Sequence, residues 1–171
     1  MYYFAYASNL SRQQMAERCP EAKPKFTARL PHYKIIFAGW SRKWRGGYAT
    51  IRQSRGDVVM GALYEISERG LRLLDKHEDY PSSYDHLKVK VVTEDGDFVE
   101  AVTYIRVGQA EEMKPSPSIW LLFRRVTRTG ACFKPSGLWC LQVPVRSSCI
   151  IDIICKGGES GVLSEVRRGQ R

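Results

Sequence analysis

The carboxylate of Glu78 is the side chain of this sequence best placed to move protons. A helix is expected from about Glu68 to Glu78 with Ser67 as its N-cap, and Leu71, Leu74 and Glu78 then fall on one face. That apolar face would carry the carboxylate toward the interior, where burial raises the pKa of a carboxyl group toward neutrality. Such a group can act as a general acid or base. The alternative is a glutamate at a helix end that faces solvent.

A second chemical feature is the small polar loop near the N-terminus. Tyr2 to Tyr6 is an uncharged run of aromatic and small apolar residues that predicts a buried strand, and Ser11 to Cys19 is expected to be helical. A tight loop therefore joins a strand to a helix. The free N–H groups of a helix's first turn carry partial positive charge, which suits a carboxylate or a phosphate. Most junctions of this kind hold only water, so the identity of the loop residues must indicate whether this one binds an anion.

The loop sequence is specific. Tyr6-Ala7-Ser8-Asn9-Leu10 resembles the Tyr-Gly-Ser-Asn-Leu signature of the gamma-glutamylcyclotransferase-like (AIG2-like) family, which also carries it at the N-terminus. The resemblance implies that Tyr6, Ala7, Ser8, Asn9 and Leu10 bind the alpha-carboxylate end of a gamma-glutamyl group. Ala7 stands where the family usually has glycine. If that glycine needs a positive φ angle or a close ligand approach, Ala7 costs about 1 kcal/mol or narrows the pocket.

The segment around Glu78 resembles the same family. It reads Leu-Asp-Lys-His-Glu-Asp-Tyr-Pro from Leu74 to Pro81, where the family has Leu-Asp-x-x-Glu-Gly-Tyr-Pro with a catalytic glutamate. The resemblance makes Glu78 the candidate general base. Asp79 stands where the family often has glycine, and its neighbouring charge leaves open which carboxylate acts. His77 is a further candidate base, but it points to a different helix face from Leu74.

The resemblance implies an α+β fold: a curved, largely antiparallel mixed sheet or partial barrel with packed helices, like that of the gamma-glutamylcyclotransferases. It also implies intramolecular aminolysis. Glu78 would take a proton from the alpha-amino group, which then attacks the gamma-carbonyl and forms 5-oxoproline as an amine or amino acid leaves. Backbone N–H groups of residues 7–9 would hold the carboxylate and the developing oxyanion. No cofactor or metal is expected.

The strands that must position these groups are predicted from residues that favour pleated surfaces. They are Ala28 to Leu30, Tyr33 to Trp40, Tyr48 to Arg52, Val58 to Ile66, Leu87 to Thr93 and Phe98 to Val107. Pro20 and Pro24 mark an irregular connection, and turns are expected at residues 46–47 and 55–57. Gly61 allows a bulge or a close backbone approach.

Two tyrosines outside the loop are candidates for substrate binding. Tyr84 follows the segment that resembles the family segment with the catalytic glutamate. Tyr104 lies in a stretch similar to the family's penultimate strand. We expect both at the pocket, although a tyrosine in a strand is more often a packing residue.

Length and composition set the class of protein. The chain has 171 residues, 43% of them hydrophobic, which is enough for one domain with a core. We expect a soluble, cytoplasmic protein, because no secretory leader and no membrane-spanning stretch is visible. Five cysteines without a recognisable spacing indicate reduced thiols. The oligomeric state is left open.

The net charge of +9 is unevenly distributed. Between Lys23 and Arg55 there are nine basic residues and no acidic one, interleaved with aromatic side chains. This pattern is typical of nucleic-acid binding, but we favour a sheet with a solvated basic face and aromatics turned inward. A basic rim would also attract an acidic small molecule as substrate. A catalytically silent small-molecule binder of the same fold is a further alternative, suggested by Ala7 and by the atypical C-terminal segment.

The resemblance extends over residues 1–117, and residues 118–171 form an atypical basic tail. This tail holds nine basic and three acidic residues and four of the five cysteines, whose spacing fits no zinc site: Cys132, Cys140, Cys149 and Cys155. One hypothesis is a frameshift near Ser118, because shifted codons for Arg125 to Cys132 permit Gly-Tyr-Gln-Asp-Trp-Arg-Leu, similar to the family's closing segment. The tail would then be poorly ordered. The alternative is a genuine tail.

Overall fold

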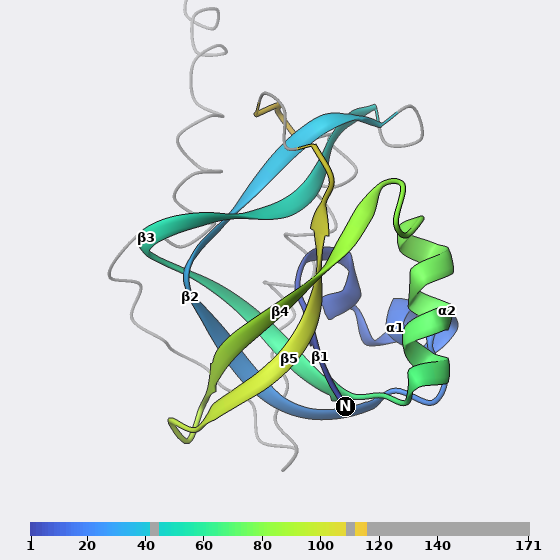
Figure 1. The fold of residues 1–171 in the computed structure, drawn as a ribbon, viewed down its shortest axis with the longest axis vertical. Coiled ribbons are helices and arrows are strands. Elements are labelled where there is room, and N and C mark those ends of the chain that lie inside the picture. Colours follow the sequence, from blue (N-terminus) through green and yellow to red (C-terminus); the bar gives the residue numbers. More distant parts are fainter. Residues whose placement is uncertain (42–44, 109–111, 116–171) are drawn as a thin grey trace, which may run out of the picture.

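The computed structural model describes residues 1–41, 45–108 and 112–115. Its strands are β1 (Tyr2–Ala5), β2 (Lys23–Ser41), β3 (Gly46–Glu65), β4 (Tyr84–Thr93) and β5 (Phe98–Arg106). They close into a barrel in the order β1-β3-β2-β4-β5 (Figure 1). The helical elements are the 3-10 turn η1 (Ala7–Leu10), α1 (Arg12–Arg18) and α2 (Glu68–Glu78). The predicted α+β fold with a mixed sheet is confirmed, and the described barrel is closed.

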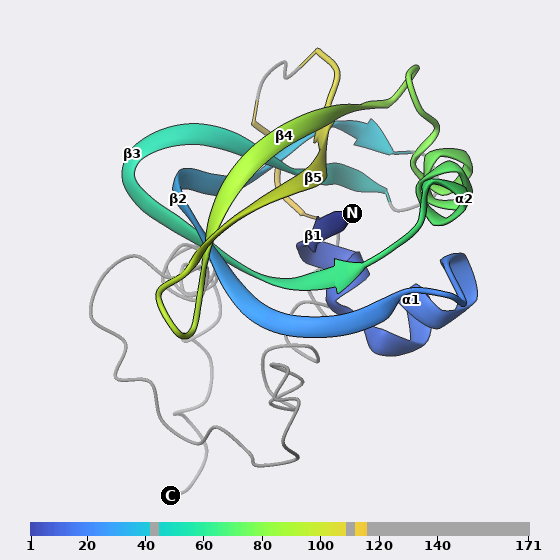
Figure 2. The same ribbon diagram turned by 60° about the horizontal axis from the view of Figure 1, so that its bottom comes forward.

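Strand direction places η1 at one particular end of the barrel. β1 is antiparallel to β3, and it is parallel to β5 where Tyr3 pairs with Val102. The other pairings, β2 with β3, β2 with β4 and β4 with β5, are antiparallel. Because β1 and β5 run in the same direction, the residues that follow β1 lie at the end of the barrel where β5 finishes. α1 and α2 cover one side of the barrel together (Figures 1 and 2).

β2 is longer than the sequence predicted. The two predicted strands, residues 28–30 and 33–40, are parts of one strand, and Pro24 lies inside it and not in an irregular connection. The register shifts between Pro31 and Tyr33, where His32 has a φ of 62°. A bulge of this kind bends a strand without ending it, which is how a small barrel turns its corners.

The two turns predicted in β3 are also wrong. Gly46 and Gly47 begin the strand, and Gly47 pairs with Trp40. Gly56 lies within β3 with a φ of 91°, so residues 55–57 bend the strand instead of separating two strands. Glycine is favoured both in a turn between two strands and in a bend within one strand, so the sequence alone does not distinguish the two.

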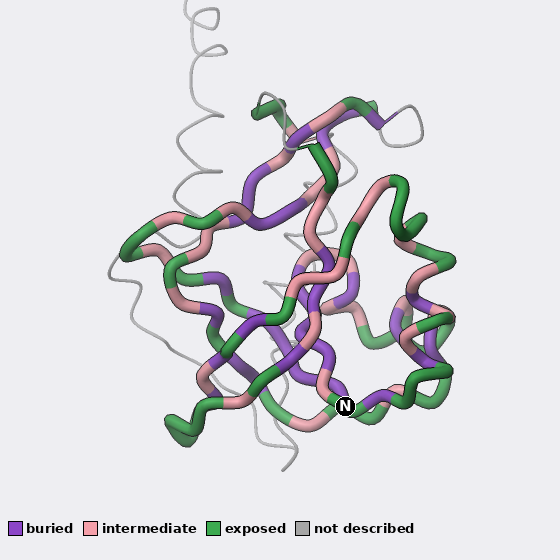
Figure 3. Tube along the Cα trace, in the orientation of Figure 1, coloured by how far each residue is buried: buried purple, intermediate pink, exposed green. Residues whose placement is uncertain are grey.

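The barrel interior is filled by apolar side chains that point inward from all five described strands, and Figure 3 shows buried residues recurring along them. The fully or nearly fully buried members include Phe4, Leu30, Ile51, Val59, Leu63 and Val91. Gly61 allows the close approach that the sequence predicted: a Cβ atom there would lie 2.4 Å from the ring of Phe4. The absence of a side chain at Gly61 on β3 therefore leaves room for the large ring of Phe4 on β1.

A second apolar cluster joins the helices to the outside of the barrel. It includes Tyr3, Met15, Tyr64, Leu74 and Tyr104. Neither α1 nor α2, the two α-helices of the described residues, is long and apolar enough to cross a membrane. Ser116-Pro117, the predicted tail of residues 118–171 and the frameshift hypothesis lie outside the described residues.

Candidate active site

Glu78 is the last residue of α2, and its carboxylate faces the N-terminal loop. Oε1 accepts a hydrogen bond of 3.0 Å from Nδ2 of Asn9, and the side chain is 16% exposed. Ser67 caps α2 at its start, with Oγ accepting from the N–H of Gly70 at 3.1 Å. Leu74, one turn before Glu78, is fully buried. Of the two orientations that the helical periodicity left open, the structure therefore has the one in which this acid is turned inward.

Asn9 holds Glu78 against the barrel. Asn9 is 4% exposed, and its Nδ2 also donates to the hydroxyl oxygen of Tyr3 on β1 at 2.6 Å. One amide group thus connects η1, β1 and the end of α2. Because Nδ2 has two hydrogens, both bonds can be made together.

Arg18 completes the polar contacts of the loop. Its Nη1 donates to Oδ1 of Asn9 and, at 3.1 Å, to Oγ of Ser8, while Nη2 donates to Oε1 of Gln14 at 2.8 Å. Nη1 also lies 3.8 Å from Oε1 of Glu78. Sequence reasoning missed Arg18. It ends a helix without a distinctive motif, and only the packing of α1 beside α2 brings it to the carboxylate.

Burial and charge act on Glu78 in opposite directions. Burial raises the pKa of the Glu78 carboxyl group, and this effect exceeds the lowering by the Asn9 hydrogen bond and by the charges of Arg18 and His77. A carboxylate with a raised pKa is a stronger base than an exposed glutamate. The same group returns a proton readily once it is protonated.

The loop itself differs from the predicted geometry. Residues 7–10 form the separate 3-10 turn η1, and α1 begins only at Arg12, with Oγ of Ser11 accepting from the N–H of Gln14 at 3.4 Å. The amide groups nearest the carboxylate are thus those of η1. Ala7 has a φ of 56°, which is left-handed backbone that costs a residue with a Cβ about 1 kcal/mol. The departure from glycine falls at a position where glycine would be unstrained.

Asp79 and His77, the neighbours of Glu78, do not share its buried position. Asp79 is exposed, has a φ of 55° and ends α2, and its Oδ2 accepts from Oγ of Ser83 at 2.7 Å. His77 is also exposed. Among the described residues, Glu78 is the only carboxylate that contacts Asn9. Of the two carboxylates, Glu78 is therefore the one that lies at the loop.

The phenol groups of the three candidate tyrosines bond to the protein. The hydroxyl of Tyr6 donates to the backbone oxygen of Tyr104 at 2.7 Å, and that of Tyr84 to the backbone oxygen of Ala49 at 2.8 Å. Burial raises the pKa of all three phenols, so they remain neutral donors. Leu10 packs against the outer apolar cluster. Tyr6, Tyr84 and Leu10 therefore have structural contacts of their own, and the hydroxyl of Tyr104 bonds to Asp75.

Asp75 anchors α2 to the sheet, and sequence reasoning did not single it out. Its Oδ1 accepts from the hydroxyl of Tyr104 at 2.7 Å and lies 2.7 Å from Nε2 of His86. The ring of His86 stacks on that of Tyr80, with centroids 4.1 Å apart. Asp75 precedes Glu78 by three residues, which is the spacing that puts two side chains on neighbouring parts of one helix face.

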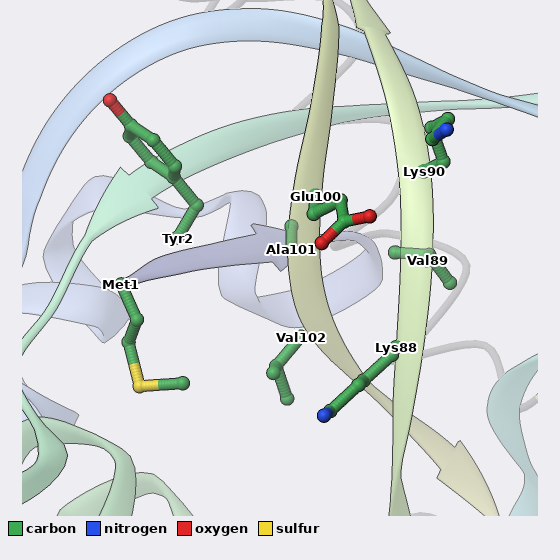
Figure 4. Close-up of a pocket in the computed structure, with 8 residues that line it drawn as sticks. All are labelled: Met1, Tyr2, Lys88, Val89, Lys90, Glu100, Ala101 and Val102. Carbon is green, nitrogen blue, oxygen red and sulfur yellow. The ribbon is translucent and has the colours of Figure 1, made fainter.

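Two hollows of the described residues have linings that do not include Glu78. One of about 460 Å³ is lined by residues of β1, β4 and β5, including Lys88, Lys90 and Glu100 (Figure 4). The second, of about 430 Å³, is lined by residues of β2 to β5, with Arg106 among them, and by the segment after β5. Within the described ranges, no group of three or more histidine, cysteine, aspartate or glutamate residues is arranged to hold a metal ion.

Comparison with known proteins finds one family. The model of the family "Gamma-glutamyl cyclotransferase, AIG2-like" matches residues 3–121. The chain is 35% identical over 141 residues to gamma-glutamylcyclotransferase of Homo sapiens, covering 80% of this chain and 71% of the relative, and 34% identical to that of Mus musculus with the same coverage. A solved structure named gamma-glutamyl cyclotransferase superposes with a TM-score of 0.70 at 28% identity, covering 92% of this chain and 99% of its own.

Proposed function

Because the chain belongs to the gamma-glutamyl cyclotransferase, AIG2-like family, we propose that it releases 5-oxoproline from gamma-glutamyl compounds, with Glu78 as general base. The observation that carries the proposal is the 3.0 Å hydrogen bond between Asn9 and Glu78. It joins the two segments that resemble the family's signature, although 69 residues separate them in the chain. The proposed setting is the cytoplasm, and the substrate is an acidic small molecule.

The proposed reaction is internal transfer of an acyl group. The Glu78 carboxylate takes a proton from the alpha-amino nitrogen, and that nitrogen forms a bond to the gamma-carbonyl carbon. The gamma-amide C–N bond then breaks, and the proton on Glu78 passes to the leaving nitrogen. The products are 5-oxoproline and a free amine, and no water is consumed. A carboxyl group whose pKa is raised suits both proton transfers.

The loop has the complementary task of holding the substrate's anionic end. Backbone N–H groups of residues 7–9 are proposed to bind the alpha-carboxylate, since the opening amides of a helical turn have no carbonyl partner within that turn. The same binding brings the alpha-amino nitrogen to Glu78. Nucleophile and carbonyl belong to one molecule, so correct folding of the substrate supplies much of the rate. Tyr84 and Tyr104 are proposed to line the pocket.

Product analysis tests the proposed function. Purified protein is incubated with a panel of gamma-glutamyl amines and gamma-glutamyl amino acids, and 5-oxoproline, glutamate and free amine are quantified by mass spectrometry. We expect equal amounts of 5-oxoproline and amine, with no incorporation of solvent ¹⁸O. Release of glutamate carrying ¹⁸O would instead identify a hydrolase. Binding without any product would identify the catalytically silent binder.

A further inference from the structure

Arg106, the last residue of β5, carries a guanidinium group that is fixed in place at the candidate site's end of the barrel. Its central carbon lies 4.1 Å from the ring centroid of Tyr48 and 5.7 Å from that of Tyr84. A Cβ atom on Gly39 would lie 3.0 Å from Nε of Arg106, so β2 also restricts the side chain. The backbone N–H donates to Oγ1 of Thr50 at 3.0 Å. Position and orientation are therefore set before any ligand binds.

Within the described residues, this cation has no anionic partner. Nη1 of Arg106 is buried without a hydrogen-bond partner among them, and none of their carboxylates forms an ion pair with the side chain. Leaving a buried donor unpaired is unfavourable, and the cost is larger for a charged group. A guanidinium group recognises carboxylates through paired N–H donors. The missing partner therefore has the chemistry of a ligand carboxylate.

Arg106 and Glu78 act on the same phenol group. Tyr84 pairs with Arg106 across β4 and β5, so their side chains project from the same face of the sheet. Burial and the charge of Glu78 raise the pKa of Tyr84, whereas the charge of Arg106 and its hydrogen bond lower it. The charges of both groups therefore act on this phenol. Arg18, not Arg106, is the cation 3.8 Å from Glu78.

We propose that Arg106 binds a carboxylate on the leaving group of the substrate, so that gamma-glutamyl amino acids or peptides with a carboxylate close to the scissile amide are preferred over uncharged gamma-glutamyl amines. The inference rests on the proposed function. The alpha-amino group must reach Glu78, and the alpha-carboxylate is attached to the same carbon, so both remain near η1. A carboxylate across the gamma-amide is the one that can lie beyond Tyr84, at Arg106.

The test compares two substrates that differ in one charge, gamma-glutamylglycine and gamma-glutamylglycinamide. For the wild-type protein we expect kcat/KM to be about 10- to 100-fold higher for the acid, the range of a charge-assisted hydrogen bond pair. Arg106→Met should lose that preference, leaving a ratio within about threefold, because the loss falls mainly on the acid. Arg106→Lys should restore part of the preference, because it keeps the charge but not the paired donors.

Lys88→Met is the matched control. It removes one positive charge from β4, and the side chain lies at the hollow of about 460 Å³ (Figure 4). The preference for the acid should therefore remain. Equal losses on both substrates in Arg106→Met, or equal loss of preference in Lys88→Met, would overturn the inference. So would a wild-type protein that does not distinguish the two substrates.

A binding measurement separates this inference from the proposed function. Dissociation constants of both compounds are measured by calorimetry for wild type and Arg106→Met. Carboxylate-dependent binding that Arg106→Met abolishes supports the inference even if no 5-oxoproline forms, in which case only the proposed function fails. Turnover of both compounds with equal affinity has the opposite meaning: the function holds and the role of Arg106 is refuted.

Discussion

Burial makes Glu78 a source of pH-dependent instability at the scale of the single residue. Its pKa is raised in the folded protein, so the folded state holds a proton at pH values where the unfolded chain has released it. Stability is therefore lost as the pH rises from the ordinary glutamate value through the raised one. Glu78→Gln does not titrate, and its amide oxygen can still accept from Asn9.

We accordingly predict that Glu78→Gln raises the free energy of unfolding at pH 8, and that its advantage over wild type shrinks as the pH falls toward 4. Urea unfolding followed by circular dichroism across this range measures the difference. An advantage that grows at low pH would show that the sign of the pKa shift is wrong.

Ala7 allows a second test at this scale, because its backbone is strained. With a φ of 56°, the residue should be relieved by glycine, although the replacement loses a methyl group that packs on the inner core. We predict that Ala7→Gly raises the free energy of unfolding by about 0.5–1 kcal/mol. Gly56→Ala is the reverse control: its φ is 91° and its Cβ would meet nothing within 4 Å, so it should destabilise through strain alone. Destabilisation by Ala7→Gly would contradict this account.

At the scale of the element, α2 is the part that must be oriented correctly. Asp75 bonds Tyr104 on β5 and His86 on β4, and Glu78 follows one helical turn later. The helix is thus anchored to the sheet close to the residue that it presents. Both α-helices were predictable within one or two residues, because Ser11 and Ser67 are N-caps and the apolar spacing is helical.

The anchor predicts energetic coupling between Asp75 and Tyr104. A hydrogen bond to a carboxylate contributes about 1.5–3 kcal/mol, so the Tyr104→Phe and Asp75→Asn variants and their double variant should give a coupling energy of about 1–2 kcal/mol in equilibrium unfolding. Purely additive losses would show that the 2.7 Å contact does not stabilise the helix.

The strands were less predictable than the helices, for a geometric reason. Pro24, His32 and Gly56 would end or turn an ordinary strand, yet each lies inside β2 or β3. A closed barrel of few strands needs long, strongly bent strands, and residues that break flat strands provide the bends. Local sequence preferences do not report on this requirement.

At the scale of the whole molecule, the closed barrel is the support for every residue of the site. Leu63 is fully buried in the interior, so we predict that Leu63→Ala lowers the free energy of unfolding by about 2–5 kcal/mol. Val58→Ala, on the same strand but 43% exposed, should cost less than about 1 kcal/mol. Denaturant unfolding measures both. Similar losses for the two variants would show that the interior is not the main source of stability.

The charge of the molecule bears on the nucleic-acid alternative. Several cations of the basic stretch already have acidic partners: Lys25 pairs with Glu65 at 2.8 Å, and Lys34 pairs with Glu112 at 3.5 Å. The aromatics are divided, since Trp40 is 58% exposed whereas Phe37 and Tyr33 are partly buried against the inner core. The described part of this stretch therefore resembles a solvated sheet face more than a surface for stacking bases.

How much of the site was predictable depended on whether its residues lie in local motifs. Asn9 and Glu78 stand in short segments that resemble a known family, whereas helical spacing alone left open whether Glu78 faces the interior or solvent. Arg18 and Arg106 stand in no such segment. They reach the site only because α1 packs beside α2 and because β5 ends where β1 ends. Contacts created by chain topology are not written in local sequence.

The most direct test of the central claim is the rate at which Glu78→Gln releases 5-oxoproline from a gamma-glutamyl substrate that the wild-type protein turns over. Asp79→Asn, at the neighbouring carboxylate, is the matched control. General-base catalysis contributes about 10²- to 10⁴-fold, so Glu78→Gln should lose at least a hundredfold in kcat with its circular dichroism spectrum unchanged, while Asp79→Asn retains most of the rate. Near-normal turnover by Glu78→Gln, or a larger loss in Asp79→Asn, would contradict the assignment of Glu78.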